Sequence, residues 1–249
     1  MTFQDHFSAI AVAYAEFRPR YPAALFDVLA AAAPARHQAW DCATGNGQAA
    51  EGLAVHFEHV VATDASPQQI ASATVHPRIM YAVARAESSG LVSDSIDLVT
   101  VAQALHWLDR PAFFAEAARV LVPNGVLAVC CYGLVEIEPA IDAAVRSYYA
   151  NTVGPYWPGG RALVEDGYRS IEFPFAEFAT APLAFERRMT LAQFGGYVRT
   201  WSATQRFVAA LGFDPVPALE RDLEAHWGHA GTARTLRWPL SLRTRRKRG

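Results

Sequence analysis

Between residues 38 and 133 the chain alternates short apolar segments typical of strands with segments typical of helices, and this alternation constrains the fold more than any other feature. The strand-like segments are QAWDCA, HVVATDAS, IMYAVARAE, SIDLVTVAQAL and VLAVCCYG. Helix-like stretches such as GQAAEGLAVHF and RPAFFAEAARVL lie between most of them. Such an alternation is typical of a parallel sheet covered by helices on both faces. We therefore predict an α/β fold with a doubly wound, mostly parallel sheet of about seven strands.

The composition fits a globular chain. Of the 249 residues, 52% are hydrophobic and 18% are charged, which allows a sizeable core. The formal net charge of −2 argues against a nucleic-acid partner, because proteins with such partners are usually basic. Basic residues gather in RTLRWPLSLRTRRKRG at the end of the chain, which we expect to be a solvated strand end and a frayed tail.

The chain shows neither a targeting signal nor a membrane segment. Its start lacks the basic and apolar regions of a signal peptide, and its apolar runs are shorter than the ~20 residues of a membrane span. The three cysteines, Cys42, Cys130 and Cys131, lack metal-ligand spacing and are expected to be reduced, buried thiols. We expect a cytoplasmic protein with no bound metal, and the richness in alanine and arginine favours a bacterial source.

The segment DCATGNGQAA, residues 41–50, forms a tight glycine loop between a predicted strand and a predicted helix. Its glycines fit G-x-G-x-x-G/A, the loop that holds dinucleotide phosphates. Asp41 favours another ligand, because a carboxylate repels a pyrophosphate but attracts an ammonium group such as that of S-adenosylmethionine. Asp64 ends the second predicted strand, 17 residues after Gly47, where an acid binds ribose hydroxyls for either ligand.

Five motifs occur in a fixed order: DCATGNG, ATDAS, ARAES, SIDLVTVAQALHWL and FFAEAARVLVPNGVLAV. Together they resemble the class I S-adenosylmethionine-dependent methyltransferases, over about residues 38–132. The segments FRPRYP, QALHW and TWS extend the resemblance to the small-molecule (type 11) branch that contains trans-aconitate methyltransferase. The resemblance implies a Rossmann-like fold, S-adenosylmethionine as cofactor, S-adenosylhomocysteine as product and a small-molecule methyl acceptor.

The resemblance also implies which residues bind the cofactor. Asp41, Ala43, Gly45 and Gly47 match the motif that binds the methionine moiety, with Ala43 in place of the usual first glycine. The other matching residues are Asp64 at the ribose, Ala65, Ala86 and Glu87 around the adenine, Gln103 and Ala104 beneath the methionine and sulfonium, and Tyr14, Arg18 and Tyr21 in an N-terminal cap. Arg85 stands where many relatives have Asp or a small residue, which favours the Ala86 backbone N–H as the adenine contact.

His106 and Trp107 follow the fourth predicted strand, at the rim where the methyl acceptor is expected. His106 can orient the acceptor or act as a general base, and Trp107 can form the pocket wall near the cation. The alternatives are a turn histidine and a core tryptophan. A carboxylate acceptor, with an ordinary pKa of about 4, needs no base, whereas a phenol or an alcohol does.

We predict a single methyltransferase domain over residues 1–249, because the sequence shows neither a linker nor a repeat. Its expected parts are N-terminal cap helices (1–37), a cofactor-binding core (38–133), a helical and aromatic substrate-pocket elaboration (134–210), and final strands with a basic tail (211–249). The candidates for the acceptor pocket are Tyr148, Tyr149, Tyr156, Trp157, Tyr168, Phe173, Tyr197 and Trp201, with Arg146, Arg161, Arg169, Arg187, Arg188 and Arg199 for an acidic acceptor.

The predicted function is the transfer of a methyl group to a small molecule by in-line displacement. The resemblance to the small-molecule branch implies a carboxylate acceptor. The residues alone leave two alternatives open: an oxidoreductase that binds an NAD-type cofactor with the same loop, and a non-catalytic protein that binds the cofactor. Either a monomer or a homodimer is compatible with the sequence.

Overall fold

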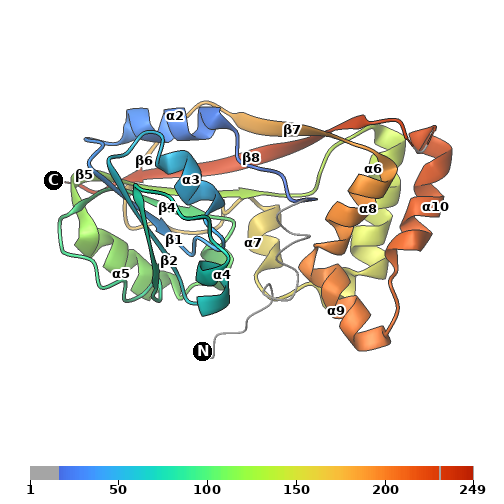
Figure 1. Cartoon of the computed structure of the whole chain (residues 1–249), viewed down its shortest axis with the longest axis horizontal. Coiled ribbons are helices and arrows are strands. Elements are labelled where there is room, and N and C mark those ends of the chain that lie inside the picture. Colours follow the sequence, from blue (N-terminus) through green and yellow to red (C-terminus); the bar gives the residue numbers. More distant parts are fainter. Residues whose placement is uncertain (1–16, 230, 249) are drawn as a thin grey trace.

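The computed structural model describes residues 17–229 and 231–248, and Figure 1 shows a sheet with helices beside it and a second group of helices at one end. The strands are β1 (Gln38–Cys42), β2 (His59–Asp64), β3 (Ile79–Val83), β4 (Ile96–Ala102), β5 (Leu121–Tyr132), β6 (Ala176–Phe178), β7 (Leu183–Met189) and β8 (Arg234–Arg246). The α-helices are α2 (Ala23–Ala32), α3 (Gln48–Leu53), α4 (Pro67–Ala71), α5 (Arg110–Val120), α6 (Pro139–Ser147), α7 (Arg161–Glu165), α8 (Leu191–Arg199), α9 (Ser202–Leu211) and α10 (Val216–Trp227). Short helical turns lie at η2 (Leu105–Trp107), η3 (Tyr148–Thr152) and η4 (Gly154–Tyr156).

The strands form one eight-stranded sheet in the order β3-β2-β1-β4-β5-β8-β6. β1 to β5 pair in parallel, and β8 runs antiparallel beside β5. β6 and β7 pair with successive stretches of β8. The chain moves outward from β1 to β3 and then returns to place β4 on the other side of β1. In open sheets of this kind, ligands bind outside the carboxyl ends of the strands at this switch point.

Helices cover both faces of the sheet because successive residues of a strand point to opposite faces. In β5, Ala128 and Cys130 belong to one core cluster, together with residues of α2 and α3. Val129 and Cys131 belong to the second cluster, together with residues of α5. The three cysteines are buried and free, as predicted. This arrangement confirms the predicted doubly wound α/β fold, with eight strands instead of about seven.

The helices that follow β5 gather at one end of the molecule. Figure 1 shows α6, α8, α9 and α10 there, beside the ends of β7 and β8, with α7 between them and the rest of the sheet. Phe194 of α8 stacks on Trp227 of α10 at a ring separation of 5.7 Å, and both side chains are buried. The part of the chain after residue 134 therefore adds a helical layer whose apolar side chains belong to the same core cluster as one face of the sheet.

Two helical details differ from the prediction. Residues 211–249 are predicted to form only strands and a tail, but α10 precedes the single strand β8 in this part of the chain. This helix buries Leu219, Leu223 and Trp227 on one face. The segment LAQFGGYVRTWSATQRFVAALG, residues 191–212, has the pattern of one helix, but it forms two, since α8 ends at Arg199 and α9 begins at Ser202.

The basic end of the chain forms a strand, as predicted, but this strand lies inside the sheet and is partly buried instead of solvated. β8 lies between β5 and β6, and Arg245 is only 8% exposed. The Arg245 guanidinium lies 4.5 Å from the ring centre of Phe173 and pairs with Glu177 at 3.0 Å. Just beyond the strand, the Lys247 ammonium pairs with Asp94 at 2.7 Å.

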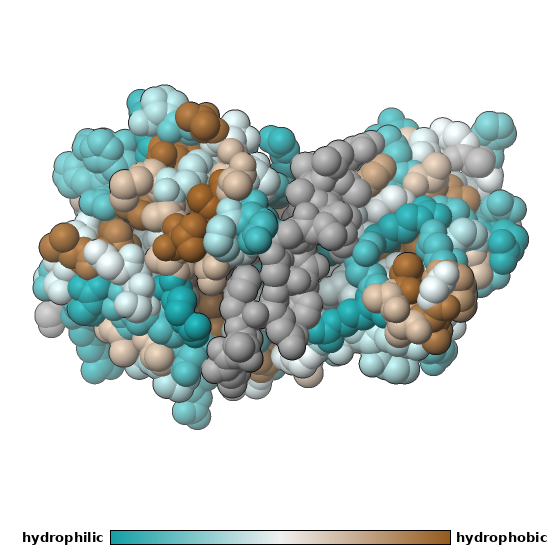
Figure 2. All heavy atoms as spheres, turned by 60° about the horizontal axis from the view of Figure 1, so that its bottom comes forward, coloured by the Kyte–Doolittle hydropathy of each residue, from teal (hydrophilic) through white to brown (hydrophobic). Residues whose placement is uncertain are grey.

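The apolar surface is divided into small groups. On the face shown in Figure 2, hydrophobic residues are separated by hydrophilic ones. Val75, Val92 and Phe213 are exposed, but they belong to separate parts of the fold. Within residues 17–229 and 231–248, no helix has both the length and the hydropathy to cross a membrane.

Candidate active site

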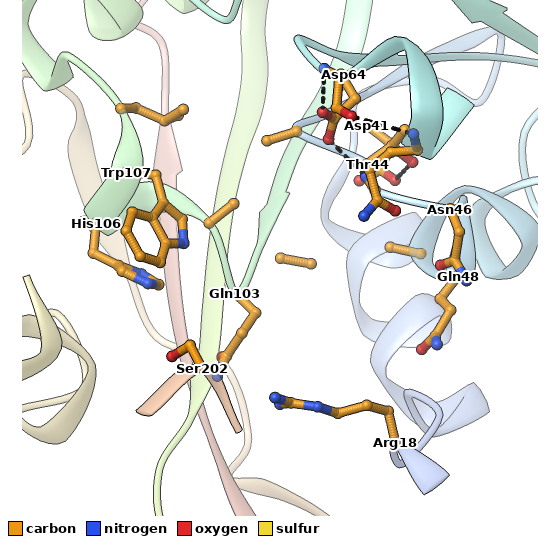
Figure 3. Close-up of a pocket in the computed structure, with 18 of the residues that line it drawn as sticks. Arg18, Asp41, Thr44, Asn46, Gln48, Asp64, Gln103, His106, Trp107 and Ser202 are labelled. Atoms are coloured by element: carbon orange, nitrogen blue, oxygen red, sulfur yellow. Dashed lines mark hydrogen bonds between the residues drawn. The ribbon is translucent and has the colours of Figure 1, made fainter. Parts of the chain in front are cut away.

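A cavity of about 420 Å³ lies between the carboxyl ends of the parallel strands and the helical layer. Its volume is in the range of small-molecule sites. Figure 3 shows Asp41 and Asp64 on one side of the cavity, His106 and Trp107 on the opposite side, and Gln103 between them. One space therefore joins the predicted cofactor side to the predicted acceptor side.

The structure brings most of the predicted site residues together. The predicted residues that line the cavity are Arg18, Tyr21, Asp41, Ala43, Gly45, Asp64, Ala65, Ala86, Glu87, Gln103, Ala104 and His106. Gly47 is not part of the lining, and Tyr14 lies outside the described residues.

Asp41 borders the cavity from within β1, and its side chain is almost completely buried. One carboxylate oxygen accepts a hydrogen bond from the Thr44 hydroxyl at 2.5 Å, and the other accepts one from the Thr100 hydroxyl at 2.7 Å. Burial raises the pKa of Asp41 to about 6, although these hydroxyls lower it. A positive group in the cavity would favour the ionised carboxylate, whereas a pyrophosphate would oppose it.

Asp64 ends β2 and organises the glycine loop. Its carboxylate accepts hydrogen bonds from the backbone N–H groups of Gly45 at 2.9 Å and Ser66 at 2.8 Å. Ser66 in turn caps α4, with Pro67 in the first turn. These bonds fix the acid at the edge of the cavity, where the ribose is expected.

Two cavity residues other than glycine have a left-handed backbone. Ala43 has a φ of 56° and Gln103 a φ of 57°. This conformation costs an L-residue about 1–2 kcal/mol and is concentrated at functional sites. It explains physically why glycine is the usual residue at position 43. The Gln103 side-chain amide pairs with both backbone groups of Tyr132, at 3.1 and 2.9 Å, so it also satisfies the end of the sheet.

Gly47 has a packing role. Its φ is 93°, and a Cβ atom there would lie 2.3 Å from the hydroxyl oxygen of Tyr81. A glycine at this position therefore allows the ring of Tyr81 to lie against the loop. The structure supports this packing role and gives Gly47 no place in the cavity lining.

Ala86 and Glu87 line the cavity just after β3. The Glu87 carboxylate accepts hydrogen bonds from the Asp109 backbone N–H at 3.2 Å and from Arg85 Nε at 3.3 Å. Ala86 is buried, and together with Ala65 it offers apolar surface to a flat group. The Arg85 side chain is 59% exposed and faces its partner Glu87.

Arg18 connects three parts of the chain at the cavity wall (Figure 3). Its Nε and Nη2 atoms donate to the hydroxyl and the carbonyl of Thr200, each at 3.0 Å, and Nη1 donates to the Tyr132 hydroxyl at 3.2 Å. Its pairing with a cofactor carboxylate stays a prediction. The observed bonds add a structural role that the sequence analysis did not foresee.

His106 lies in η2, immediately after β4, and lines the cavity. Its Nδ1 atom is 2.8 Å from the hydroxyl oxygen of the buried Tyr168. Burial, followed by the charge of Arg161, lowers the pKa of His106 to about 3. The imidazole is therefore neutral at pH 7 and is a weak base. Trp107 borders the cavity and is 37% exposed, so the core-tryptophan alternative is wrong.

The acceptor side of the cavity has an aromatic wall with Arg161 in it, and the Arg18 guanidinium lies 5.7 Å from the ring centre of Tyr197 at its edge. Among the acceptor-pocket candidates, Trp157, Arg161, Tyr197 and Trp201 line the cavity. The candidates outside the lining are Tyr148, Tyr149, Tyr156, Tyr168, Phe173, Arg146, Arg169, Arg187, Arg188 and Arg199. Arg199, for example, is held by ion pairs with Asp214 and Glu220.

Several polar residues of the site were missed by the sequence analysis. Thr44, Asn46, Gln48 and Ser202 line the cavity. The first three lie in the glycine segment, where their place in the loop is a usable signal. Thr100 has no local signal, since it faces Asp41 only because β4 pairs with β1 in that register.

Comparison with known proteins identifies the family. Residues 40–129 match a family described as a methyltransferase domain. A protein of Dictyostelium discoideum, assigned as a methyltransferase, is 33% identical over 225 residues, which cover 89% of this chain and 86% of that protein. The chain belongs to the class I S-adenosylmethionine-dependent methyltransferases.

Solved structures agree with this membership. A protein of Anaeromyxobacter dehalogenans assigned as a type II methyltransferase has a TM-score of 0.88 and 44% identity, with coverage of 93% of this chain and 99% of that one. A phosphoethanolamine N-methyltransferase of Haemonchus contortus, solved with S-adenosylmethionine, has a TM-score of 0.52 and 16% identity, with coverage of 97% and 57%. The second likeness shows the fold alone.

The residues of this methyltransferase fit the cofactor of its family. Two carboxylates, Asp41 and Asp64, border one side of the cavity, and small apolar residues such as Ala65 and Ala86 lie near them. This set suits an ammonium group, ribose hydroxyls and a flat base, and it lacks the phosphate-compatible charge of a dinucleotide loop. The alternative of an NAD-type oxidoreductase is therefore wrong, and family membership favours an enzyme over a non-catalytic binding protein.

Proposed function

We propose that the protein transfers a methyl group from S-adenosylmethionine to a small-molecule carboxylate by in-line displacement. The observation that carries this proposal is the single cavity that joins the Asp41 and Asp64 side to the His106, Arg161 and Trp157 side. The acceptor oxygen forms a bond to the methyl carbon while the electron pair of the carbon–sulfur bond leaves with sulfur. The cytoplasmic location, a bacterial source and a monomer or homodimer remain predictions.

The residues of the chain have to hold both reactants and exclude water. Asp41 would attract the cofactor ammonium group, Asp64 would accept hydrogen bonds from the ribose, and Ala65 and Ala86 would contact the adenine. When bound, the cofactor supplies a methyl group that is already activated by its sulfonium. The enzyme therefore gains most by aligning the acceptor atom with that methyl group.

The acceptor side favours a group that needs no deprotonation. His106 is a poor proton acceptor, since burial and the charge of Arg161 lower its pKa to about 3. Arg161 supplies a positive charge on the same side of the cavity. A carboxylate is ionised at neutral pH and is attracted by that charge, whereas a phenol or an alcohol would need a base. These features support a carboxylate acceptor.

Two measurements test this function. S-adenosylhomocysteine should raise the thermal midpoint of the purified protein, whereas NAD should leave it unchanged. The release of S-adenosylhomocysteine from S-adenosylmethionine should then depend on a carboxylate in a panel of acids, with the matching alcohols and phenols inactive. Methyl transfer to the alcohols but not to the acids would overturn the carboxylate proposal, and stabilisation by NAD alone would overturn the cofactor proposal.

A further inference from the structure

Arg161 is held at the acceptor side by aromatic rings. Its guanidinium carbon lies 4.3 Å from the ring centre of Trp157 and 5.2 Å from that of Tyr149. Its Nε atom donates to the Tyr149 hydroxyl at 2.5 Å. Stacking fixes the plane of the guanidinium and keeps the charge near apolar surface. The side chain is 19% exposed, so its charge is only partly screened by solvent.

Within the described residues, no side chain or backbone group accepts a hydrogen bond from the terminal nitrogens of Arg161, and its contacts with Tyr149 and Glu165 involve Nε. Glu165 lies 3.9 Å from Nε, beyond the Tyr149 hydroxyl, and is half exposed to solvent. The carboxylates that border the cavity are Asp41, Asp64 and Glu87, which belong to the predicted cofactor side. The acceptor side therefore combines a fixed cation with donor groups that an anion can use.

His106 supplies a second donor beside this cation. Burial raises the pKa of Tyr168 well above its ordinary value, so the phenol keeps its proton. The Tyr168 hydroxyl oxygen lies 2.8 Å from the Nδ1 atom of His106, and we assign the protonated phenol as the donor of this hydrogen bond. With Nδ1 as acceptor, the proton of the neutral ring resides on Nε2. Figure 3 shows the His106 ring extending into the cavity.

Gly160 keeps the cation next to this histidine. It precedes Arg161 and has a φ of 85°, and a Cβ atom there would lie 3.0 Å from the His106 carbonyl oxygen. The backbone before α7 therefore rests directly on η2. We propose that Arg161 and the Nε2–H of His106 form a two-point subsite for the acceptor carboxylate, in which Tyr168 is the positioning residue that makes His106 a donor.

The subsite rests on the proposed function, and it specifies the chemical class of the methyl acceptor more closely. The carboxylate would lie between Arg161 and His106, and the body of the acceptor would contact Trp107, Trp157 and Trp201, which line the same side. The flat aromatic surfaces favour a planar, unsaturated body. We therefore infer an aromatic or conjugated carboxylic acid of small size.

Binding of benzoate to the protein saturated with S-adenosylhomocysteine tests the subsite without methyl transfer. Isothermal titration should show benzoate binding at least about tenfold more tightly than benzamide, which has the same shape without the charge. Arg161→Met should abolish this preference, and Arg169→Met, an exposed substitution with the same change in charge, should preserve it. Equal affinities for benzoate and benzamide, or an unchanged preference in Arg161→Met, would overturn the subsite.

The positioning role of Tyr168 is tested by determining which ring nitrogen of His106 carries the proton. The 15N shifts of His106 should show a protonated Nε2 and an unprotonated Nδ1, and a protonated Nδ1 would overturn the assignment. Tyr168→Phe should weaken benzoate binding about fivefold, whereas His106→Gln, which offers an N–H of its own, should keep most of the affinity. In the His106→Gln background, Tyr168→Phe should have no further effect, and a second loss would show a merely structural role.

The outcomes also separate the two proposals. A protein that binds S-adenosylhomocysteine but not benzoate overturns the anion subsite and leaves the methyltransferase function intact. A protein that does not bind S-adenosylhomocysteine overturns the proposed function itself.

Discussion

Asp41 combines a predicted role in ligand binding with a cost to the fold. Its carboxylate is buried between the hydroxyls of Thr44 and Thr100, and no positive side chain of the described residues forms an ion pair with it. A buried charge without a counter-charge destabilises the folded state. The cofactor ammonium group would supply that counter-charge, so ligand binding and stability should respond in opposite directions to the loss of the charge.

We expect Asp41→Asn to weaken S-adenosylhomocysteine binding at least about tenfold and to stabilise the ligand-free protein at pH 7. The asparagine retains the shape and can bond to both hydroxyls, so the change removes mainly the charge. Isothermal titration gives the affinity, and denaturant unfolding gives the free energy of unfolding. An unchanged affinity would refute the role of Asp41 in attracting the ammonium group.

The stability difference should depend on pH with a defined sign. Burial raises the pKa of folded Asp41 to about 6 from 3.8, so the folded state binds this proton more tightly than the unfolded state. The ligand-free wild type therefore loses stability as the pH rises from about 4 to 6, by up to about 3 kcal/mol. The gap between Asp41→Asn and the wild type should be largest above pH 6 and vanish near pH 4. A gap that is constant with pH would contradict this explanation.

Ala43 has a strained backbone conformation in the glycine loop, and its substitution by glycine should relieve that strain. The φ of 56° costs an alanine about 1–2 kcal/mol, while glycine loses about 0.5–1 kcal/mol more backbone entropy on folding. We expect Ala43→Gly to raise the free energy of unfolding by up to about 1 kcal/mol. Ala39→Gly in β1, where the methyl group is buried, serves as control and should be destabilising. A loss of stability in Ala43→Gly would show that its methyl group contributes more by packing.

At the scale of elements, the contact between the start of α7 and η2 holds Arg161 and His106 close together on the acceptor side of the cavity. Gly160→Ala places a Cβ atom 3.0 Å from the His106 carbonyl oxygen on a backbone with a φ of 85°. We expect kcat/KM for the acceptor to fall at least about tenfold, because a shift near 1 Å misaligns the reactants. The affinity for S-adenosylhomocysteine should change less than about twofold.

The neighbouring glycine provides a matched control. A Cβ atom at Gly159 would meet no atom within 4 Å, so Gly159→Ala should leave both acceptor kinetics and cofactor affinity unchanged. Equal losses in Gly159→Ala and Gly160→Ala would indicate that the loop needs general flexibility. That result would argue against a specific contact with His106.

The elements also show what a sequence can and cannot predict. The alternation of strand-like and helix-like segments predicted the parallel core, because each of those segments carries its own apolar pattern. The spacing of Leu219, Leu223 and Trp227 was an available signal for α10 that the sequence analysis did not use. The break between α8 and α9 has no glycine or proline at Thr200 and Trp201, and it follows from the burial of Trp201 against other elements. Long-range packing of this kind has no local signal.

The whole molecule depends on contacts that join the sheet to the helical layer around the cavity. Arg18 is one such contact, because it bonds to Thr200 between α8 and α9 and to Tyr132 at the end of β5. In Figure 1, α8 and α9 belong to the group of helices at one end of the molecule, and β5 belongs to the sheet. Hydrogen bonds from a charged group contribute about 1.5–3 kcal/mol each when both partners are shielded from water.

We expect Arg18→Met to lower the free energy of unfolding by about 1–3 kcal/mol and to weaken S-adenosylhomocysteine binding about tenfold. Both effects share one cause, since the same guanidinium ties the two layers together and forms the cavity wall. Arg20→Met is the matched control, because the Arg20 side chain is 78% exposed and lies 3.8 Å from Glu51, a pair that contributes little. Unfolding curves and titrations of both variants check the prediction. A loss of stability without a loss of affinity would mean that Arg18 joins the layers but contributes nothing to the cofactor site.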